Sequence, residues 1–98
     1  MIESVFFNAL AESELNDAAR YYESQIKGLG VAFLDEVEHS IKTIQQNPES
    51  FPAILKVIRR KTLHRFPYSI MYSFESNSIR ILAVANQKRR PFYWRSRK

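Results

Sequence analysis

The chain has 98 residues and no cysteine, which excludes disulfides and thiolate zinc sites and leads us to expect a reducing, cytoplasmic setting. Hydrophobic residues make up 45% of the chain, so we expect a single globular domain over residues 1–98 with one core. No apolar run approaches the roughly 20 residues that a membrane-spanning helix needs, so no membrane partner is expected. The start of the chain carries Glu3 within a short apolar run, which is typical of a strand and not of a signal peptide.

Charge is divided unevenly along the chain. Residues 1–50 hold nine acids and three bases, whereas residues 51–98 hold twelve bases and one acid. The division predicts a strongly cationic surface, which attracts polyanions or acidic protein partners. The tail (residues 88–98) has six bases around the adjacent aromatic residues Phe92, Tyr93 and Trp94. Because cations bind phosphates or carboxylates and flat rings stack or fill apolar pockets, the tail points to a macromolecular target and not to a small metabolite.

The first half of the chain predicts one strand and two helices. The strand covers Ile2–Phe7, and an amphipathic helix follows over about Ala9–Ile26, with Asn8 as its N-cap. A Gly-Leu-Gly turn leads into a second helix, which ends near Asn47 and Pro48. Since so short a turn joins the two helices, we expect them to be antiparallel neighbours.

After Pro52 the pattern becomes strand-like. Strands are predicted over Ile54–Leu63, Tyr68–Phe74 and Ile79–Ala85, and a hairpin turn joins the last two. The final strand is apolar on both faces apart from Arg80, which is typical of a central strand covered on both sides. The order β-α-α-β-β-β predicts an α+β domain in which an antiparallel helical hairpin packs on one face of a largely antiparallel sheet. The acids then fall on the helices and the bases on the second strand and the tail, which are two sides of the molecule.

The sequence gives little support for metal or nucleophilic catalysis. The two histidines, His39 and His64, belong to no set with metal-ligand spacing, so neither a metal nor a cofactor is expected. Serines are scattered, neither glycine belongs to a phosphate-binding loop, and the acids on the helices are interpreted as solvated faces. Tyr68 and Tyr72 alternate on one predicted strand, so we expect them on the same sheet face, in or beside the core.

A set of basic and tyrosine side chains remains, and it permits two functions. Its members are Arg59, Arg60, Lys61, Arg65, Arg89, Arg90, Tyr93, Arg95 and Arg97. Such a set can simply bind a partner. It can also cleave RNA without a metal, because a base removes the 2′-OH proton while arginine stabilises the charge on the phosphate. Trp94 likewise has two possible roles, which are to clamp the tail onto the sheet or to contact the target.

Five segments, taken in order, resemble the RelE/ParE superfamily of toxins from type II toxin–antitoxin systems. They are AARYYESQIKGLG, FLDEVEHSI, NPESFP, IRRKTLHRFPYSIMY and ILAVANQKRRPFYWRSR, and they span nearly the full length. The resemblance implies the RelE/ParE toxin fold and a small antitoxin as partner in a hetero-oligomer. We expect the antitoxin to bind the basic side through Arg59, Arg60, Lys61 and Arg65.

Two departures from the superfamily bear on activity. Its ribosome-dependent RNases have an arginine after the tyrosine of the third strand, where this chain has Ser69, and many members have a histidine where it has Asn86. The FPYSIMY segment and the Tyr-Trp tail resemble the ParE branch, whose members inhibit DNA gyrase. The resemblance therefore implies a gyrase inhibitor, for which the expected target-binding residues are Arg89, Arg90, Tyr93, Trp94, Arg95 and Arg97.

Two alternatives stay open at this point. One is a RelE-like, ribosome-dependent mRNA endonuclease with Arg65, Arg89 and Tyr93 as catalytic residues. The other is an inactive member that keeps antitoxin binding only.

Overall fold

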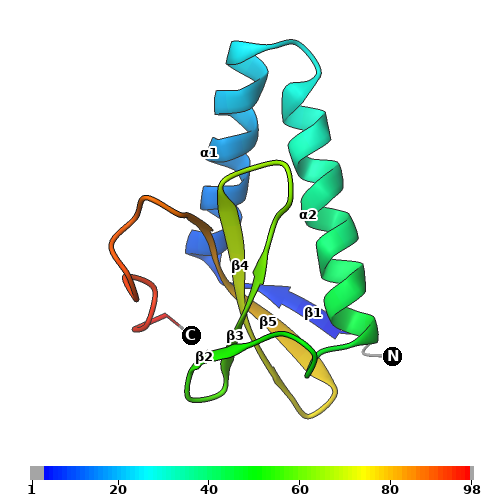
Figure 1. The fold of residues 1–98 in the computed structure, drawn as a ribbon, viewed down its shortest axis with the longest axis vertical. Coiled ribbons are helices and arrows are strands. Elements are labelled where there is room, and N and C mark those ends of the chain that lie inside the picture. Colours follow the sequence, from blue (N-terminus) through cyan, green and yellow to red (C-terminus); the bar gives the residue numbers. More distant parts are fainter. Residues whose placement is uncertain (1–3, 98) are drawn as a thin grey trace.

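The computed structural model in Figure 1 describes residues 4–97, so Ile2 and Glu3 of the predicted first strand lie outside the described residues. The elements are β1 (Ser4–Phe7), α1 (Ala9–Gln25), α2 (Leu29–Gln46), β2 (Ala53–Leu55), β3 (Ile58–Thr62), β4 (Tyr68–Glu75) and β5 (Ser78–Asn86). The strands form one sheet in the order β1-β5-β4-β3-β2; β1 pairs with β5 in parallel, and the other three pairings are antiparallel. The α+β class, the helical hairpin and the largely antiparallel sheet are confirmed. Within residues 4–97, neither helix is long and apolar enough to cross a lipid bilayer.

The helical hairpin is set by local chemistry at its turns. Asn8 caps α1 by accepting a hydrogen bond from the N–H of Leu10 at 2.8 Å. Gly28 precedes α2 with a φ of 89°, a conformation that other residues rarely adopt. The Glu23 carboxylate accepts the N–H groups of Gly28 and Gly30 at 2.9 and 3.0 Å, so it caps α2 across the turn. Glu23 is exposed, so its place on a solvated face is compatible with this capping role.

Gly30 lies where α2 approaches the backbone of α1. A Cβ at Gly30 would lie 2.6 Å from the carbonyl oxygen of Ala19, so the two helices would have to separate. We expect Gly30→Ala to lower the free energy of unfolding by about 1–3 kcal/mol in urea denaturation, even though alanine has the better helix propensity. The matched control is Val31→Ala at a position that is 60% exposed, and it should stay within about 0.5 kcal/mol of wild type. An equally stable Gly30→Ala would contradict this close approach.

An aromatic cluster fills the space between the hairpin and the sheet. Its rings meet edge to face or tilted at centroid distances of 4.8 to 6.1 Å; the members are Tyr22, Phe33, Phe66 and Tyr68. Tyr72 belongs to the same core at 0% exposure, and its hydroxyl donates to the Pro48 carbonyl at 2.7 Å. Tyr68 and Tyr72 therefore share the helix-facing side of β4, as predicted.

The buried Tyr72 phenol should leave a mark on alkaline stability. Burial raises its pKa to about 12, although the Arg59 charge acts in the opposite direction. An unfolded tyrosine ionises near pH 10, so the stability that this group contributes is complete below about pH 10 and is lost as the pH rises to about 12. We expect Tyr72→Phe to cost about 1–2 kcal/mol at pH 8, because the Pro48 carbonyl loses its donor. In urea unfolding, the difference in the free energy of unfolding between wild type and Tyr72→Phe should narrow toward zero near about pH 11. A difference that stays constant with pH would contradict the raised pKa of Tyr72.

The single strand predicted over Ile54–Leu63 is wrong. Leu55 pairs with Ile58, so β2 and β3 form a tight hairpin, and Lys56 takes a φ of 52° in its turn. The turn contains neither glycine nor proline, and the apolar residues on both sides of Lys56 resemble one uninterrupted strand. The element order is therefore β-α-α-β-β-β-β, and β2 forms one edge of the sheet.

The central position predicted for the final strand is confirmed. β5 lies between β1 and β4. Ile79, Ile81 and Val84 face the helices, whereas Leu82 and Ala83 belong to a second buried cluster on the opposite face of the sheet. That opposite face carries the candidate site.

Candidate partner-binding groove

The tail, which is the orange-to-red segment of Figure 1, packs against the sheet face opposite the helices. Trp94 is 2% exposed and packs into the second buried cluster, whose other buried members are Met71, Leu82, Ala83 and Ala85. The backbone N–H groups of Tyr93, Arg95 and Arg97 each donate to the carbonyl three residues earlier, so the described part of the tail forms successive turns. Of its two possible roles, Trp94 takes that of a clamp.

The tail and the sheet enclose a groove of about 630 Å³. Ser69, Met71 and Ala85 come from the central strands, and Arg60 comes from β3. The tail supplies one wall, which includes Arg89, Arg90 and Phe92. None of the described lining residues is an acid, so the groove combines an apolar floor with a cationic rim.

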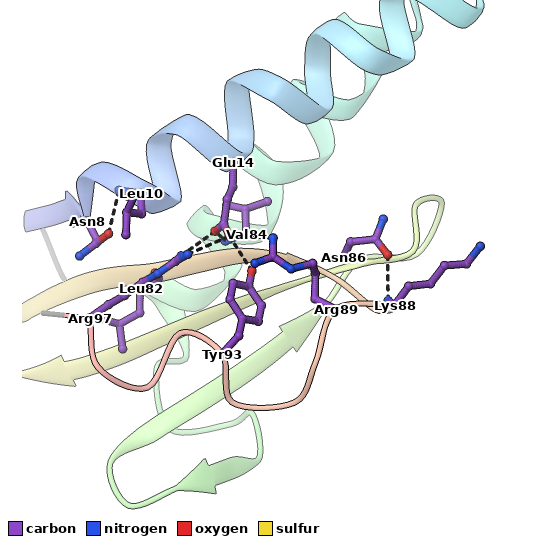
Figure 2. Close-up of polar contacts among 10 residues, drawn as sticks. All are labelled: Asn8, Leu10, Glu14, Leu82, Val84, Asn86, Lys88, Arg89, Tyr93 and Arg97. Atoms are coloured by element: carbon purple, nitrogen blue, oxygen red, sulfur yellow. Dashed lines mark hydrogen bonds and ion pairs between the residues drawn. The ribbon is translucent and has the colours of Figure 1, made fainter.

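Glu14 on α1 holds the tail in place, as Figure 2 shows. Its Oε1 accepts from the N–H of Val84 at 3.0 Å and from Nη1 of Arg97 at 2.8 Å. Its Oε2 accepts from the Tyr93 hydroxyl at 2.6 Å and from Nη2 of Arg97 at 3.1 Å. Arg97 also donates to the Leu82 carbonyl at 3.1 Å. The side chains of Glu14 and Arg97 are only 15% and 11% exposed, so this is a nearly buried ion pair.

The ion pair lies where β5 lacks a neighbouring strand. β1 ends at Phe7, opposite Ile81, and the chain then turns into α1. Beyond that point the N–H of Val84 and the carbonyl of Leu82 would have no strand partner within the described residues. Glu14 and Arg97 bind these two groups and so satisfy the open edge of the central strand.

Glu14 was not among the predicted site residues, although the sequence contained a signal. Ala11, Glu14 and Ala18 recur at i, i+3 and i+7, and both alanines are buried. An acid on the buried stripe of a helix must find partners or shift its ionisation. Reading Glu14 as part of a solvated face is therefore wrong.

The Tyr93 phenol is engaged and held protonated. Burial raises its pKa, and the hydrogen bond and negative charge of Glu14 raise it further, against the opposing charges of Arg89 and Arg97. The Arg89 guanidinium stacks over the Tyr93 ring at 3.9 Å from its centroid and lies 3.9 Å from the Glu14 carboxylate. Tyr93 thus acts as a hydrogen-bond donor to Glu14 and a platform for Arg89.

The structure does not gather the three candidate catalytic residues into one site. Arg89 and Tyr93 line the groove. Arg65 instead follows β3 and lines a separate hollow beside α2, together with Lys61 and His39. Its guanidinium lies 5.5 Å from the centroid of the Phe66 ring. The backbone N–H groups of Arg65 and the preceding histidine donate to the Glu36 carboxylate, which is a further helix acid with a structural role.

The residues expected to bind the antitoxin are also divided between two faces. Arg60 lines the groove, whereas Arg59 donates to the carbonyl oxygens of Glu49 and Phe51 at 3.2 and 2.7 Å. The Lys61 ammonium lies over the Phe51 ring at 5.4 Å from its centroid. Because side chains alternate along a strand, adjacent arginines of β3 face opposite sides of the sheet.

The residues expected to bind the target all lie on the tail, but they differ in access. Arg89, Arg90 and Arg95 are exposed, Tyr93 and Arg97 are partly buried against Glu14, and Trp94 is buried. Among residues 4–97 there is no cluster of three or more His, Cys, Asp or Glu side chains that could hold a metal ion.

Comparison with known proteins identifies the family. The family model of the ParE toxin of the type II toxin–antitoxin system parDE matches residues 5–91. No curated protein sequence matches the chain. A chain of a solved structure, described as the chromosomal ParDE TA system from P. aeruginosa, superposes with a TM-score of 0.72 at 20% identity, over 87% of this chain and 96% of that chain. At this identity the superposition supports the fold, whereas the family model covers most of the sequence. The chain belongs to the ParE toxin family of type II toxin–antitoxin systems.

Proposed function

We propose that this toxin inhibits DNA gyrase when its antitoxin does not bind it, and that the groove and tail form the contact surface. The observation that carries the proposal is the state of Tyr93. A base for RNA cleavage must take a proton, but this phenol keeps its proton and donates a hydrogen bond to Glu14. The groove therefore offers cations and apolar surface for docking, which suits a protein target.

Ser69 and Asn86 stand where the nucleases of the superfamily have an arginine and many members have a histidine, and both favour docking over RNA cleavage. Ser69 is 4% exposed, and its hydroxyl lies 3.2 Å from that of Thr62, so it brings no charge to the groove. The Asn86 side chain accepts from the N–H of Lys88 at 2.8 Å (Figure 2), and a carboxamide does not ionise near neutral pH, so it cannot act as a general acid or base. An arginine and a histidine at these positions would have supplied phosphate stabilisation and proton transfer.

The antitoxin should use the same basic side. We expect an amphipathic helix that contacts the apolar floor and an acidic stretch that follows the cationic rim. Of the four residues expected to bind it, Arg60 is the one in the groove. Arg59, Lys61 and Arg65 lie along the helix-facing edge, where a longer antitoxin segment would have to wrap.

The test combines a supercoiling assay with the purified protein and primer extension on mRNA from cells after induction. We expect the toxin to inhibit supercoiling by gyrase, and primer extension after induction in cells should show no new 5′ ends in mRNA. Arg90→Ala should raise the concentration needed for half-inhibition at least about fivefold, because Arg90 lies exposed on the groove rim. The matched control is Arg80→Ala, which removes an exposed arginine of β5 outside the groove and should leave inhibition unchanged.

Two other results would each reject the proposal. Codon-specific cleavage of mRNA on translating ribosomes, with supercoiling unaffected, would establish the endonuclease alternative. Normal growth with well-expressed, folded toxin, together with uninhibited gyrase, would point to a member that only binds its antitoxin.

A further inference from the structure

We infer that Glu14 is a positioning residue, whose carboxylate latches the tail to the sheet and thereby builds the partner-binding groove. One side chain joins three parts of the fold, because it accepts from Val84 of β5 and from Tyr93 and Arg97 of the tail while it stands on α1 (Figure 2). Glu14 does not line the groove, so it would act there only through the tail.

The tail depends on this latch for its polar attachment. Within residues 4–97, the hydrogen bonds that tie residues 92–97 to the helices and the sheet end on Glu14 or on the Leu82 carbonyl. The other bonds of this segment run within the tail itself. Apolar packing of Trp94 holds the tail against the sheet, and the Glu14 contacts fix its rotation and register there.

The latch requires a carboxylate and not merely a polar side chain. Glu14 receives four hydrogen bonds, two on each oxygen, and every partner is a donor. In Glu14→Gln one oxygen becomes an NH₂ group, which is itself a donor. Each oxygen binds one nitrogen of Arg97, so an Arg97 N–H would confront the new NH₂ group in either orientation of the amide. The Arg97 guanidinium would also stay nearly buried without a counter-charge.

The latch extends to the cationic wall of the groove. Tyr93 carries the Arg89 guanidinium on its ring, and Arg90 accepts the Tyr93 N–H at its backbone carbonyl. Release of Tyr93 would therefore displace both arginines from the rim opposite Arg60. This functional consequence rests on the proposed function, whereas the latch itself does not.

Trp94 is the only tryptophan of the chain, so its fluorescence reports docking of the tail directly. In Glu14→Gln we expect a red-shifted emission, stronger quenching by acrylamide, and at least about tenfold faster hydrogen exchange at the amides of Tyr93, Arg95 and Arg97. The far-UV circular dichroism should stay that of wild type. The matched control is Asp17→Asn, which removes the same charge from the same helix at an exposed ion pair with Arg20, and its emission should not change.

A second pair of variants tests the latch from the tail. Arg97→Gln should shift the Trp94 emission as Glu14→Gln does, whereas Arg95→Gln, the same change at an exposed site, should not. If Glu14→Gln does not fold, this pair decides the question alone. Unchanged emission in folded Arg97→Gln and Glu14→Gln would overturn the latch.

The supercoiling assay tests the positioning role of Glu14 separately from the proposal that gyrase is the target. Glu14→Gln should require at least about tenfold more protein for half-inhibition of gyrase, although Glu14 lies outside the groove. If Glu14→Gln undocks Trp94 but inhibits gyrase like wild type, the positioning role is overturned; gyrase then remains the target, but the docked tail and groove are not its contact surface. If wild-type toxin does not inhibit gyrase, the proposed function fails, and the emission of Trp94 still decides the latch.

Discussion

Trp94→Ala is expected to release the tail from the sheet and to abolish growth arrest. Trp94 is 2% exposed against the central strands, and truncation of a buried tryptophan typically costs about 3–5 kcal/mol. A domain of this size has about 5–15 kcal/mol of total stability, so the variant should remain folded but unfold at much lower urea concentration. Measured together, urea unfolding and growth after induction should both show the loss.

Phe92→Ala provides the comparison that separates packing from contact. Phe92 is 40% exposed and meets the Trp94 ring edge to face at 5.8 Å, so its truncation should cost less than about 1 kcal/mol of stability. Phe92 lines the groove, so gyrase inhibition should nevertheless weaken. If Trp94→Ala were as stable as Phe92→Ala, the clamp role of Trp94 would be contradicted.

Much of the fold follows from local patterns. The 3.6-residue spacing predicted both helices, and the two-sided apolar run predicted that β5 lies at the centre of the sheet. The hairpin turn between the last two strands was also predicted. In the structure Ser76 and Asn77 adopt the positive φ values that suit a tight hairpin. By contrast, Lys56 adopts its φ of 52° in the β2–β3 turn without any turn-forming residue beside it. Pairing between the two strands selects that turn, and such pairing is not visible in local composition.

The site was harder to predict, because its geometry depends on contacts between distant parts of the chain. Glu14 meets Tyr93 and Arg97 across 79 and 83 residues of sequence. No local pattern links an acid on the first helix to the tail, although the place of Glu14 on a buried stripe marked it as unusual. The sequence predicted a cationic surface, and the groove has one. It did not predict how the basic residues are placed, because Arg59 and Arg60 face opposite sides of the sheet.

The adjacent arginines of β3 therefore provide a matched pair for antitoxin binding. Arg60→Ala should slow association with the antitoxin by about tenfold at low salt, and the difference should shrink at high salt, because an exposed rim charge steers encounter. Its stability should stay within about 0.5 kcal/mol of wild type. Arg59→Ala should instead cost about 1.5–3 kcal/mol of stability, because the Glu49 and Phe51 carbonyls lose a charged donor, and association should change little.

Stopped-flow association at two salt concentrations and urea unfolding of both variants would check this pair. Equal slowing in Arg59→Ala and Arg60→Ala, with the same salt dependence, would mean that the antitoxin responds to the net charge of the strand and not to the groove.

The groove also predicts a shared consequence for the antitoxin and the target. Arg60 and Arg90 line the same hollow, so Arg60→Glu should weaken gyrase inhibition as well as antitoxin binding. If Arg60→Glu weakened only antitoxin binding, gyrase would have to bind a different surface of the toxin. The antitoxin could then not neutralise the toxin by occupying the groove.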